Sequence, residues 1–347
     1  MMKYKNIYTC LLAAAAFVLG SCNEVWEEEQ YQQYVSFKAP SYSSSVTTVR
    51  VKYKEDGVRY RLPLLVSGTL NNEHDLDVHV GVDNDTLPLF NLNHFGDDRQ
   101  DLWFRQLNTS RFFFNPVTRI PAGENSALID ILLDFNGLDF SEKWVLPLIV
   151  EDDPSYGYQS HPRLDYNNAL LYFLPFNDFS GKFGASTLNV KVKGTNASRL
   201  PLNERYAYVV GENSVFFYAG AIDENRADRK LFKIKATFIE DETFVPESGA
   251  ELKKRGTVKL EAMNDIVGLD FAAVGTPTYE VKDRMDSETP TTMIRTLTVK
   301  GLNYSFNDPK RVQGEIISYD VDGSMTLERR INTTIPDEEF AIDWSVW

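Results

Sequence analysis

Short runs of β-branched and aromatic residues recur along the chain between Asn, Asp, Gly and Pro residues, and long amphipathic helical periods are nearly absent. This spacing is typical of antiparallel β-architecture. In the first half it predicts strands at residues 46–53, 60–66, 76–82, 128–133 and 144–150. Pro147 lies in the last of these and has no N–H for a sheet ladder, which favours an edge position or a bulge. Seven or so strands over ~150 residues predict an immunoglobulin-like β-sandwich.

The second half continues the pattern and predicts strands at residues 183–193, 206–210, 214–219, 231–239, 257–262, 293–299, 315–321 and 324–330. Asp322-Gly323 between the last two favours a hairpin turn. Phe340, Ile342 and Trp344 alternate with polar or small residues, which predicts one more half-buried strand. So many sequential strands indicate a closed lipocalin-like antiparallel barrel or a second sandwich, with an interior that holds a small apolar ligand or is filled by side chains.

The N-terminus has the features of an export signal, because Lys3 and Lys5 precede an apolar run at residues 11–19. That run is shorter than the ~20 residues that span a bilayer. Leu-Gly-Ser-Cys at 19–22 follows the pattern of a lipobox, so we expect residues 1–21 to be a lipoprotein signal peptide and Cys22 to be lipidated. An ordinary secretory signal ending near a cysteine is the alternative.

Residues 22–34 form an acidic tether, with Glu24 and three consecutive glutamates at 27–29. The tether is either a solvated spacer or a signal that sorts the lipoprotein to the exterior face of the outer membrane. The strand pattern pauses near Pro175, which divides the mature chain into a sandwich domain at 35–176 and a barrel or sandwich domain at 177–347.

The formal net charge is −14, and removal of residues 1–21 makes the chain still more acidic. Nucleic acid is therefore not an expected partner, since a phosphate backbone requires a basic stripe. The only two cysteines are Cys10 and Cys22. A chain processed at Cys22 has no disulfide and depends on burial for its stability.

Four segments carry a family resemblance: Thr-Arg-Ile-Pro-Ala-Gly-Glu at 118–124, Trp-Val-Leu-Pro-Leu at 144–148, Phe-Ser-Gly-Lys-Phe at 179–183 and residues 325–333. With the lipobox, they resemble Bacteroidetes polysaccharide-utilisation surface lipoproteins, which have an N-terminal immunoglobulin-like domain of unknown function. The resemblance implies a cell-surface protein that helps to capture oligosaccharide beside an outer-membrane importer complex of the starch-utilisation type. Residues 88–111 are longer and more polar-aromatic than the family pattern.

The sequence offers little catalytic chemistry. Its four histidines are scattered without metal-ligand spacing, and it has no nucleophile elbow, phosphate loop or dinucleotide fingerprint. We therefore expect no enzyme, no cofactor and no metal site. A glycosidase remains an alternative, because any acidic protein offers carboxylate pairs such as Asp152-Asp153.

Two aromatic groups outside the strand pattern are candidates for glycan binding, since sugars stack on flat aromatic faces and loops commonly carry function. The first is Trp103, Phe104 and Arg105, although Trp103 could instead pin its loop to the body. The second is Tyr156, Tyr158 and His161. Trp144 and Trp344 are in phase with apolar strand neighbours and are predicted to be core.

The pattern as a whole predicts a lipid-anchored outer-membrane protein that binds oligosaccharide or polysaccharide. The alternative is a structural or interaction lipoprotein that binds no sugar.

Overall fold

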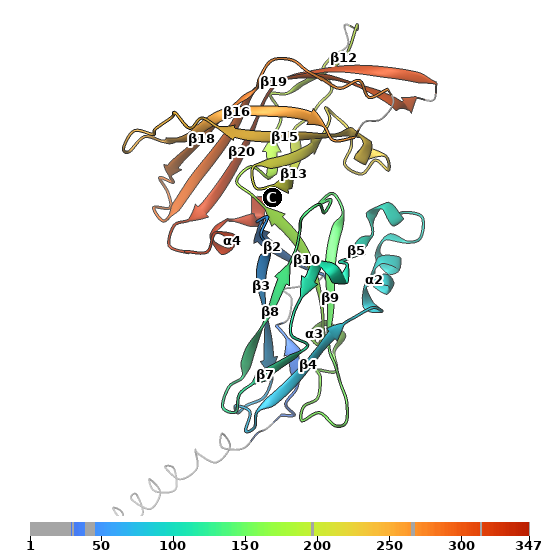
Figure 1. Cartoon of the computed structure of the whole chain (residues 1–347), viewed down its shortest axis with the longest axis vertical. Coiled ribbons are helices and arrows are strands. Elements are labelled where there is room, and N and C mark those ends of the chain that lie inside the picture. The colour runs from blue at the N-terminus through green and yellow to red at the C-terminus, as the bar shows by residue number, and fades with distance from the viewer. Residues whose placement is uncertain are drawn as a thin grey trace, which may run out of the picture.

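The computed structural model describes residues 29, 31–38, 46–195, 198–264, 268–312 and 314–346, in two domains stacked end to end (Figure 1). Strands hold 50% of the residues and helices 9%, which confirms the predicted all-β fold. The predicted signal peptide, Cys22 and most of the predicted tether lie outside the described residues.

The sandwich domain consists of two β-sheets. The first has the strand order β1 (Val35–Phe37), β3 (Val58–Val66), β8 (Ser126–Leu133) and β6 (Phe112–Phe113). The second has the order β2 (Val46–Lys52), β10 (Asn168–Phe176), β9 (Lys143–Val150), β4 (Leu76–Val82) and β7 (Val117–Ile120), with β5 (Phe104–Gln106) beside β9. Buried and exposed residues alternate along β8, as a sheet with one buried face requires. The buried faces of both sheets meet in one apolar core.

Pro147 lies in an interior strand, so the predicted edge position is wrong. β9 pairs with β10 on one side and with β4 on the other. Proline is tolerated because the paired part of β4 ends at Val82, opposite Leu148. The neighbouring Asp83 N–H donates to the Pro147 carbonyl (3.1 Å), and no N–H is needed in return.

A helical layer that the sequence pattern did not predict covers the outer face of the second sheet. It contains α2 (Thr86–Phe95), and the other short helices of the domain are η1 (Gln100–Leu102), η2 (Thr109–Arg111) and α3 (Leu164–Asn167). The Asp83 carboxylate accepts the backbone N–H groups of Asp85 and Thr86 (3.0 and 3.1 Å) and so fixes the start of α2. Leu87 packs against Leu170 on the sheet.

The second domain is an eight-stranded antiparallel barrel with the order β20-β11-β13-β14-β15-β16-β18-β19, closed by pairing of β19 with β20. Its strands are β11 (Gly181–Gly184), β13 (Glu204–Gly211), β14 (Ser214–Tyr218), β15 (Lys233–Glu240), β16 (Leu252–Ala262), β18 (Thr278–Met285), β19 (Thr292–Val312) and β20 (Glu315–Asn332). The hairpin of β19 and β20 extends beyond the barrel and carries β12 (Asn189–Val192) and β17 (Ala272–Ala273). The helical turn η3 (Arg229–Phe232) precedes β15.

Apolar side chains fill the barrel. The void at its centre measures about 10 Å³ and is lined by residues such as Phe183, Val299 and Met325. That space holds one water at most. Of the two predicted alternatives, the filled interior is therefore the observed one.

The structure differs from the predicted barrel strands at residues 183–193 and at the predicted turn between 315–321 and 324–330. Residues 183–193 form β11 and β12 with a turn between them, because the Leu188 N–H donates to the Ala185 carbonyl (2.9 Å). Asp322-Gly323 is no hairpin turn, since β20 runs straight through it. A Cβ at Gly323 would collide with the Thr187 carbonyl oxygen, so glycine is required by close packing. Gly301, at φ +71°, forms a bulge opposite it.

The predicted C-terminal strand is also wrong. The segment forms α4 (Glu338–Ala341) and the turn η4 (Trp344–Val346), and Trp344 is only half-buried. Asp337 begins α4, and Glu338 and Glu339 occupy its first turn, where carboxylates favour a helix. Ala341 and Ile342 are buried, whereas Phe340 is 71% exposed.

Ion pairs join the two domains. On one side, barrel cations meet sandwich anions: Arg229 with Asp101 (3.4 Å), Lys230 with Glu142, and Lys233 with Asp139 (2.5 Å). On the other side, Lys52 of β2 contacts Glu338 of α4 (2.5 Å).

The connection between the domains is fixed by a buried arginine. Arg329 of β20 is 1% exposed and donates hydrogen bonds to the carbonyl oxygens of Asn177 and Ser180, the latter at 2.7 Å. The Asn177 side chain in turn donates to the carbonyls of Gly211 (2.7 Å) and Ser214 (3.1 Å).

Candidate functional site

The first predicted aromatic group, Trp103, Phe104 and Arg105, lies at the junction with the barrel. The Trp103 indole N–H donates to the Gly96 carbonyl (2.9 Å), and Arg105 contacts Glu142 (3.5 Å). Phe104 packs edge-on against Tyr172, with ring centroids 5.5 Å apart. All three side chains are engaged within the protein.

The same stretch connects the domains. The Asn91 side chain of α2 makes two hydrogen bonds of 2.9 Å with the backbone of Phe104, which holds β5 beside β9. Next to it, Arg99 donates to the carbonyl of Asn225 in the barrel (3.2 Å). Residues 88–111, which we expected from the sequence to differ from the family pattern, therefore contact the barrel.

The second predicted group, Tyr156, Tyr158 and His161, lies at the far end of the sandwich. Tyr156 stacks on His79 (4.0 Å between centroids, 3° between planes), and His161 stacks on Tyr166 (4.6 Å). The buried Tyr158 hydroxyl accepts the His79 N–H and donates to the Glu151 carbonyl, both at 2.9 Å. Burial raises the pKa of this hydroxyl to about 12.

The fold does not bring the two groups together. Phe104 pairs with Lys143 at the start of β9, while Tyr158 contacts Glu151, just beyond its end. Eight strand residues at ~3.3 Å each separate them by ~26 Å. They cannot contact the same sugar unit.

A groove of about 580 Å³ lies elsewhere, between the two domains. We call it the interdomain groove. Its walls are residues 47–51 of β2 and 59–61 of β3, and its end is formed by Asp337, Glu339, Phe340 and Trp344. Sequence reasoning placed Trp344 in the core and overlooked Phe340; Pro-Asp-Glu-Glu at 336–339 was the signal of a helix start.

The groove exists because the sandwich is open on this side. Among the described strands, β2 pairs with β10 alone, and β1 covers β3 only at residues 64–66. The edges of the two sheets therefore face each other without a strand between them. A volume of this size lies in the usual range of ligand sites.

Aromatic and charged groups meet at the end of the groove. Trp344 packs edge-on against Phe176 (4.9 Å), and its indole N–H donates to the Glu339 carbonyl (2.8 Å). The Arg50 guanidinium lies 4.5 Å from the centroid of the Trp344 ring, a cation–π distance. Phe340 remains the most exposed aromatic side chain of the groove.

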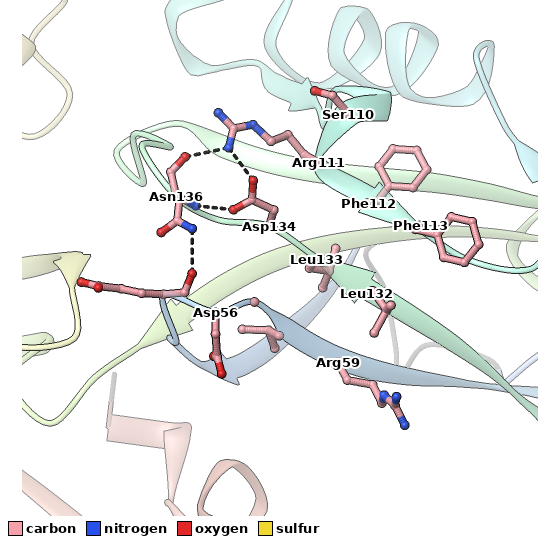
Figure 2. Close-up of a pocket in the computed structure, with 13 residues that line it drawn as sticks. Asp56, Arg59, Ser110, Arg111, Phe112, Phe113, Leu132, Leu133, Asp134 and Asn136 are labelled. Atoms are coloured by element: carbon pink, nitrogen blue, oxygen red, sulfur yellow. Dashed lines mark hydrogen bonds and ion pairs between the residues drawn. The ribbon is translucent and has the colours of Figure 1, made fainter.

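A second hollow of about 470 Å³, the sheet-end pocket, lies on the other flank of β3 (Figure 2). Its polar groups bind one another: Arg111 donates to Asp134 (3.0 Å) and to the Asn136 carbonyl (2.7 Å), and the Asn136 side chain donates to the Glu55 carbonyl (2.7 Å). Arg59 lines both hollows and in Figure 2 lies apart from this network. Phe113, which also lines this pocket, is 68% exposed.

The described residues include no group of three or more His, Cys, Asp or Glu side chains that could hold a metal ion. Within the same residues, no helix has the length and apolar character needed to cross a bilayer.

Comparison with known proteins identifies the relatives of the chain. A family model described as a domain of unknown function (DUF4973) matches residues 26–154, and a second model, for a C-terminal domain, matches residues 167–326. A Bacteroides ovatus structure of unknown function is 38% identical, with a TM-score of 0.77, and the alignment covers 90% of this chain and 100% of that one. The chain therefore belongs to one family with this Bacteroides ovatus protein, and its N-terminal domain matches DUF4973.

Two further solved structures resemble this protein over both domains. One is a Bacteroides ovatus multidomain protein including DUF1735 (37% identity, TM-score 0.75, 90% of this chain and 100% of that one). The other is an auxiliary nutrient binding protein from Bacteroides thetaiotaomicron (33% identity, TM-score 0.73, 87% and 96%). A comparison with curated proteins found no match. The predicted family resemblance is confirmed.

Proposed function

We propose that this protein is a cell-surface lipoprotein that binds oligosaccharide or polysaccharide in the interdomain groove, as an accessory of a glycan-uptake system. The observation that carries the proposal is the exposed Phe340 ring beside guanidinium and carboxylate groups in a hollow of about 580 Å³. The nutrient-binding relative supports it.

The groove offers what a sugar needs. A pyranose presents C–H groups on its face and hydroxyls around its edge, so it stacks on an aromatic ring while polar side chains bind its rim. Phe340 supplies the ring. The Asp337 and Glu339 carboxylates can accept hydrogen bonds from sugar hydroxyls, and the Arg59 guanidinium can donate them.

The site is tested by titrating Phe340→Ala with a panel of polysaccharides in affinity electrophoresis and calorimetry. We expect at least tenfold weaker binding, about 1.4 kcal/mol. Stability should change by less than about 0.5 kcal/mol, because the ring is exposed. Val245→Ala, at an 80% exposed apolar residue of the barrel, is the control.

Phe113→Ala tests which of the two hollows binds the ligand. If it weakens binding as Phe340→Ala does, the ligand spans both hollows across Arg59. Loss of binding with Phe113→Ala alone moves the site to the sheet-end pocket. A folded protein that binds no member of the panel contradicts the proposal.

We also propose that Cys22 carries the lipid that holds the protein on the outer face of the outer membrane. Cys22→Ser should shift the protein from the membrane fraction to the soluble fraction. Protease added to intact cells should digest the wild-type protein. Mass spectrometry that finds Cys22 unmodified would contradict this part of the proposal.

Binding without catalysis completes the proposed function. No reducing sugar should be released from any glycan that binds. Release that disappears with Asp337→Asn or Glu339→Gln would instead reveal a glycosidase.

An apolar row favours a second role, docking to the outer-membrane importer complex. Phe113, Leu128 and Leu132 lie on the outer face of the first sheet, and all are more than two-fifths exposed. If docking is the main role, Leu132→Asp should abolish co-purification with the importer while Phe340→Ala leaves it intact.

A further inference from the structure

Three arginines line the interdomain groove of a chain in which 50 acidic residues outnumber 36 basic ones. Arg59 and Arg61 lie on the β3 wall, and Arg50 lies on the β2 wall. Arg59 and Arg61 are two residues apart on one strand, so their side chains leave the same face of the sheet ~6.6 Å from each other.

The arginines of the β3 wall are available to a ligand. Arg59 is exposed and makes no ion pair with any described residue. Arg61 contacts Asp130 at 3.4 Å, but both side chains are more than half exposed. Such a surface pair contributes only ~0–1 kcal/mol, so an anionic ligand can replace Asp130 at small cost.

Arg50 is held in position. Its guanidinium stacks on Trp344, and it hydrogen-bonds the Tyr206 side chain. A guanidinium that stacks by its face still presents N–H donors along its edge, in the planar arrangement that suits carboxylate and sulfate oxygens.

The groove is also lined by carboxylates. Asp337 and Glu339 belong to the C-terminal segment, next to Phe340. The groove thus has a cationic wall beside an aromatic and acidic end. A neutral sugar on Phe340 can reach the carboxylates, while an anionic group on a neighbouring unit reaches the β3 wall.

We infer that the groove selects glycans that carry carboxylate or sulfate groups, which Arg59 and Arg61 bind while Phe340 stacks on the adjacent sugar. This inference rests on the proposed glycan-binding function and names its substrate class.

The test compares charged polymers with their neutral counterparts in calorimetry. Polygalacturonate and its fully methyl-esterified form probe the carboxylate, and a sulfated galactan and its desulfated form probe the sulfate. We expect at least tenfold tighter binding of one charged polymer than of its neutral counterpart. The affinity should fall as salt is raised, because exposed charges are screened.

The double variant Arg59→Gln/Arg61→Gln should bind the charged polymer at least tenfold more weakly, and its affinity should depend little on salt. Arg284→Gln, at an exposed arginine of barrel strand β18, is the matched control and should change neither. The thermal midpoint of each variant confirms that it is folded.

The inference and the proposed function fail differently. Equal binding of charged and neutral polymers, unchanged by Arg59→Gln/Arg61→Gln but lost with Phe340→Ala, overturns the inference and leaves the function. A loss of affinity with Arg284→Gln as large as that with Arg59→Gln/Arg61→Gln shows general charge attraction and also overturns the inference. No binding to any polymer overturns the proposed function, and the inference with it.

Discussion

The barrel and the sandwich differ in what they do with the edges of their sheets. The barrel pairs β19 with β20 and so leaves no edge in its eight-stranded wall, and its interior void is about 10 Å³. The sandwich leaves β2 and much of β3 as neighbouring edges, and a groove of about 580 Å³ lies between them. Closure gives stability, and the open side gives a surface that a ligand can reach.

Removing a barrel core ring should have the largest effect. Phe183 is 1% exposed and lines the small void, so Phe183→Ala should lower the free energy of unfolding by about 3–5 kcal/mol. Urea denaturation measures it, and groove binding by the folded fraction should stay unchanged. A loss below about 1 kcal/mol would mean that the barrel interior is not tightly packed.

Arg329 tests whether the connection between the domains depends on one side chain. Arg329→Met keeps the apolar stem but leaves the carbonyls of Asn177 and Ser180 without their charged donor. We expect a loss of about 2–3 kcal/mol in urea denaturation. Arg284→Met, at an exposed arginine of β18, is the control and should cost less. Equal losses would contradict the special role of Arg329.

Trp103 tests whether an aromatic side chain of the sandwich outside the groove contributes to stability alone. Because its indole pins residues 96–103 to each other, Trp103→Ala should cost roughly 1–2 kcal/mol of stability. Glycan affinity should not change, since the ring lies outside the groove. Weaker binding at unchanged stability would return Trp103 to the role in glycan binding that its sequence context predicts.

The sequence predicted the strands better than it predicted turns and contacts between segments that are far apart in the chain. Alternation was sufficient for β4 and β13, because each has one buried face. It failed at Gly323, because the Thr187 carbonyl in the turn between β11 and β12 leaves no room for a Cβ at that position. No local pattern contains that contact.

The candidate site was missed for a related reason. Phe340 and Trp344 alternate with polar or small residues, as a strand requires, yet the segment begins a short helix after Asp337 and Phe340 is 71% exposed. The groove itself depends on which strand edges lack a partner, a property of the assembled sheets. Trp103 and Tyr156 stood out in the sequence because they interrupt the strand pattern, and the structure uses both for packing.

The smallest expected effect concerns Asp101, which pairs with Arg99 in the sandwich and with Arg229 of the barrel. The hydrogen bond from Arg99, with the nearby charge of Arg229 on the barrel, lowers the pKa of Asp101 to about 2. A carboxylate whose pKa is lower in the folded state stabilises the protein above its ordinary pKa near 4, and this contribution disappears as the pH falls through about 2. The Arg99 and Asp101 side chains are 45% and 27% exposed, so solvent screening keeps the contribution below about 1 kcal/mol.

Thermal unfolding of Asp101→Asn between pH 2 and 6 measures that contribution. The wild-type advantage over Asp101→Asn should be present at pH 6, shrink below pH 4 and be absent near pH 2. High salt at pH 6 should reduce it in the same way. An advantage that persists at pH 2 would show that Asp101 acts through packing rather than through its charge.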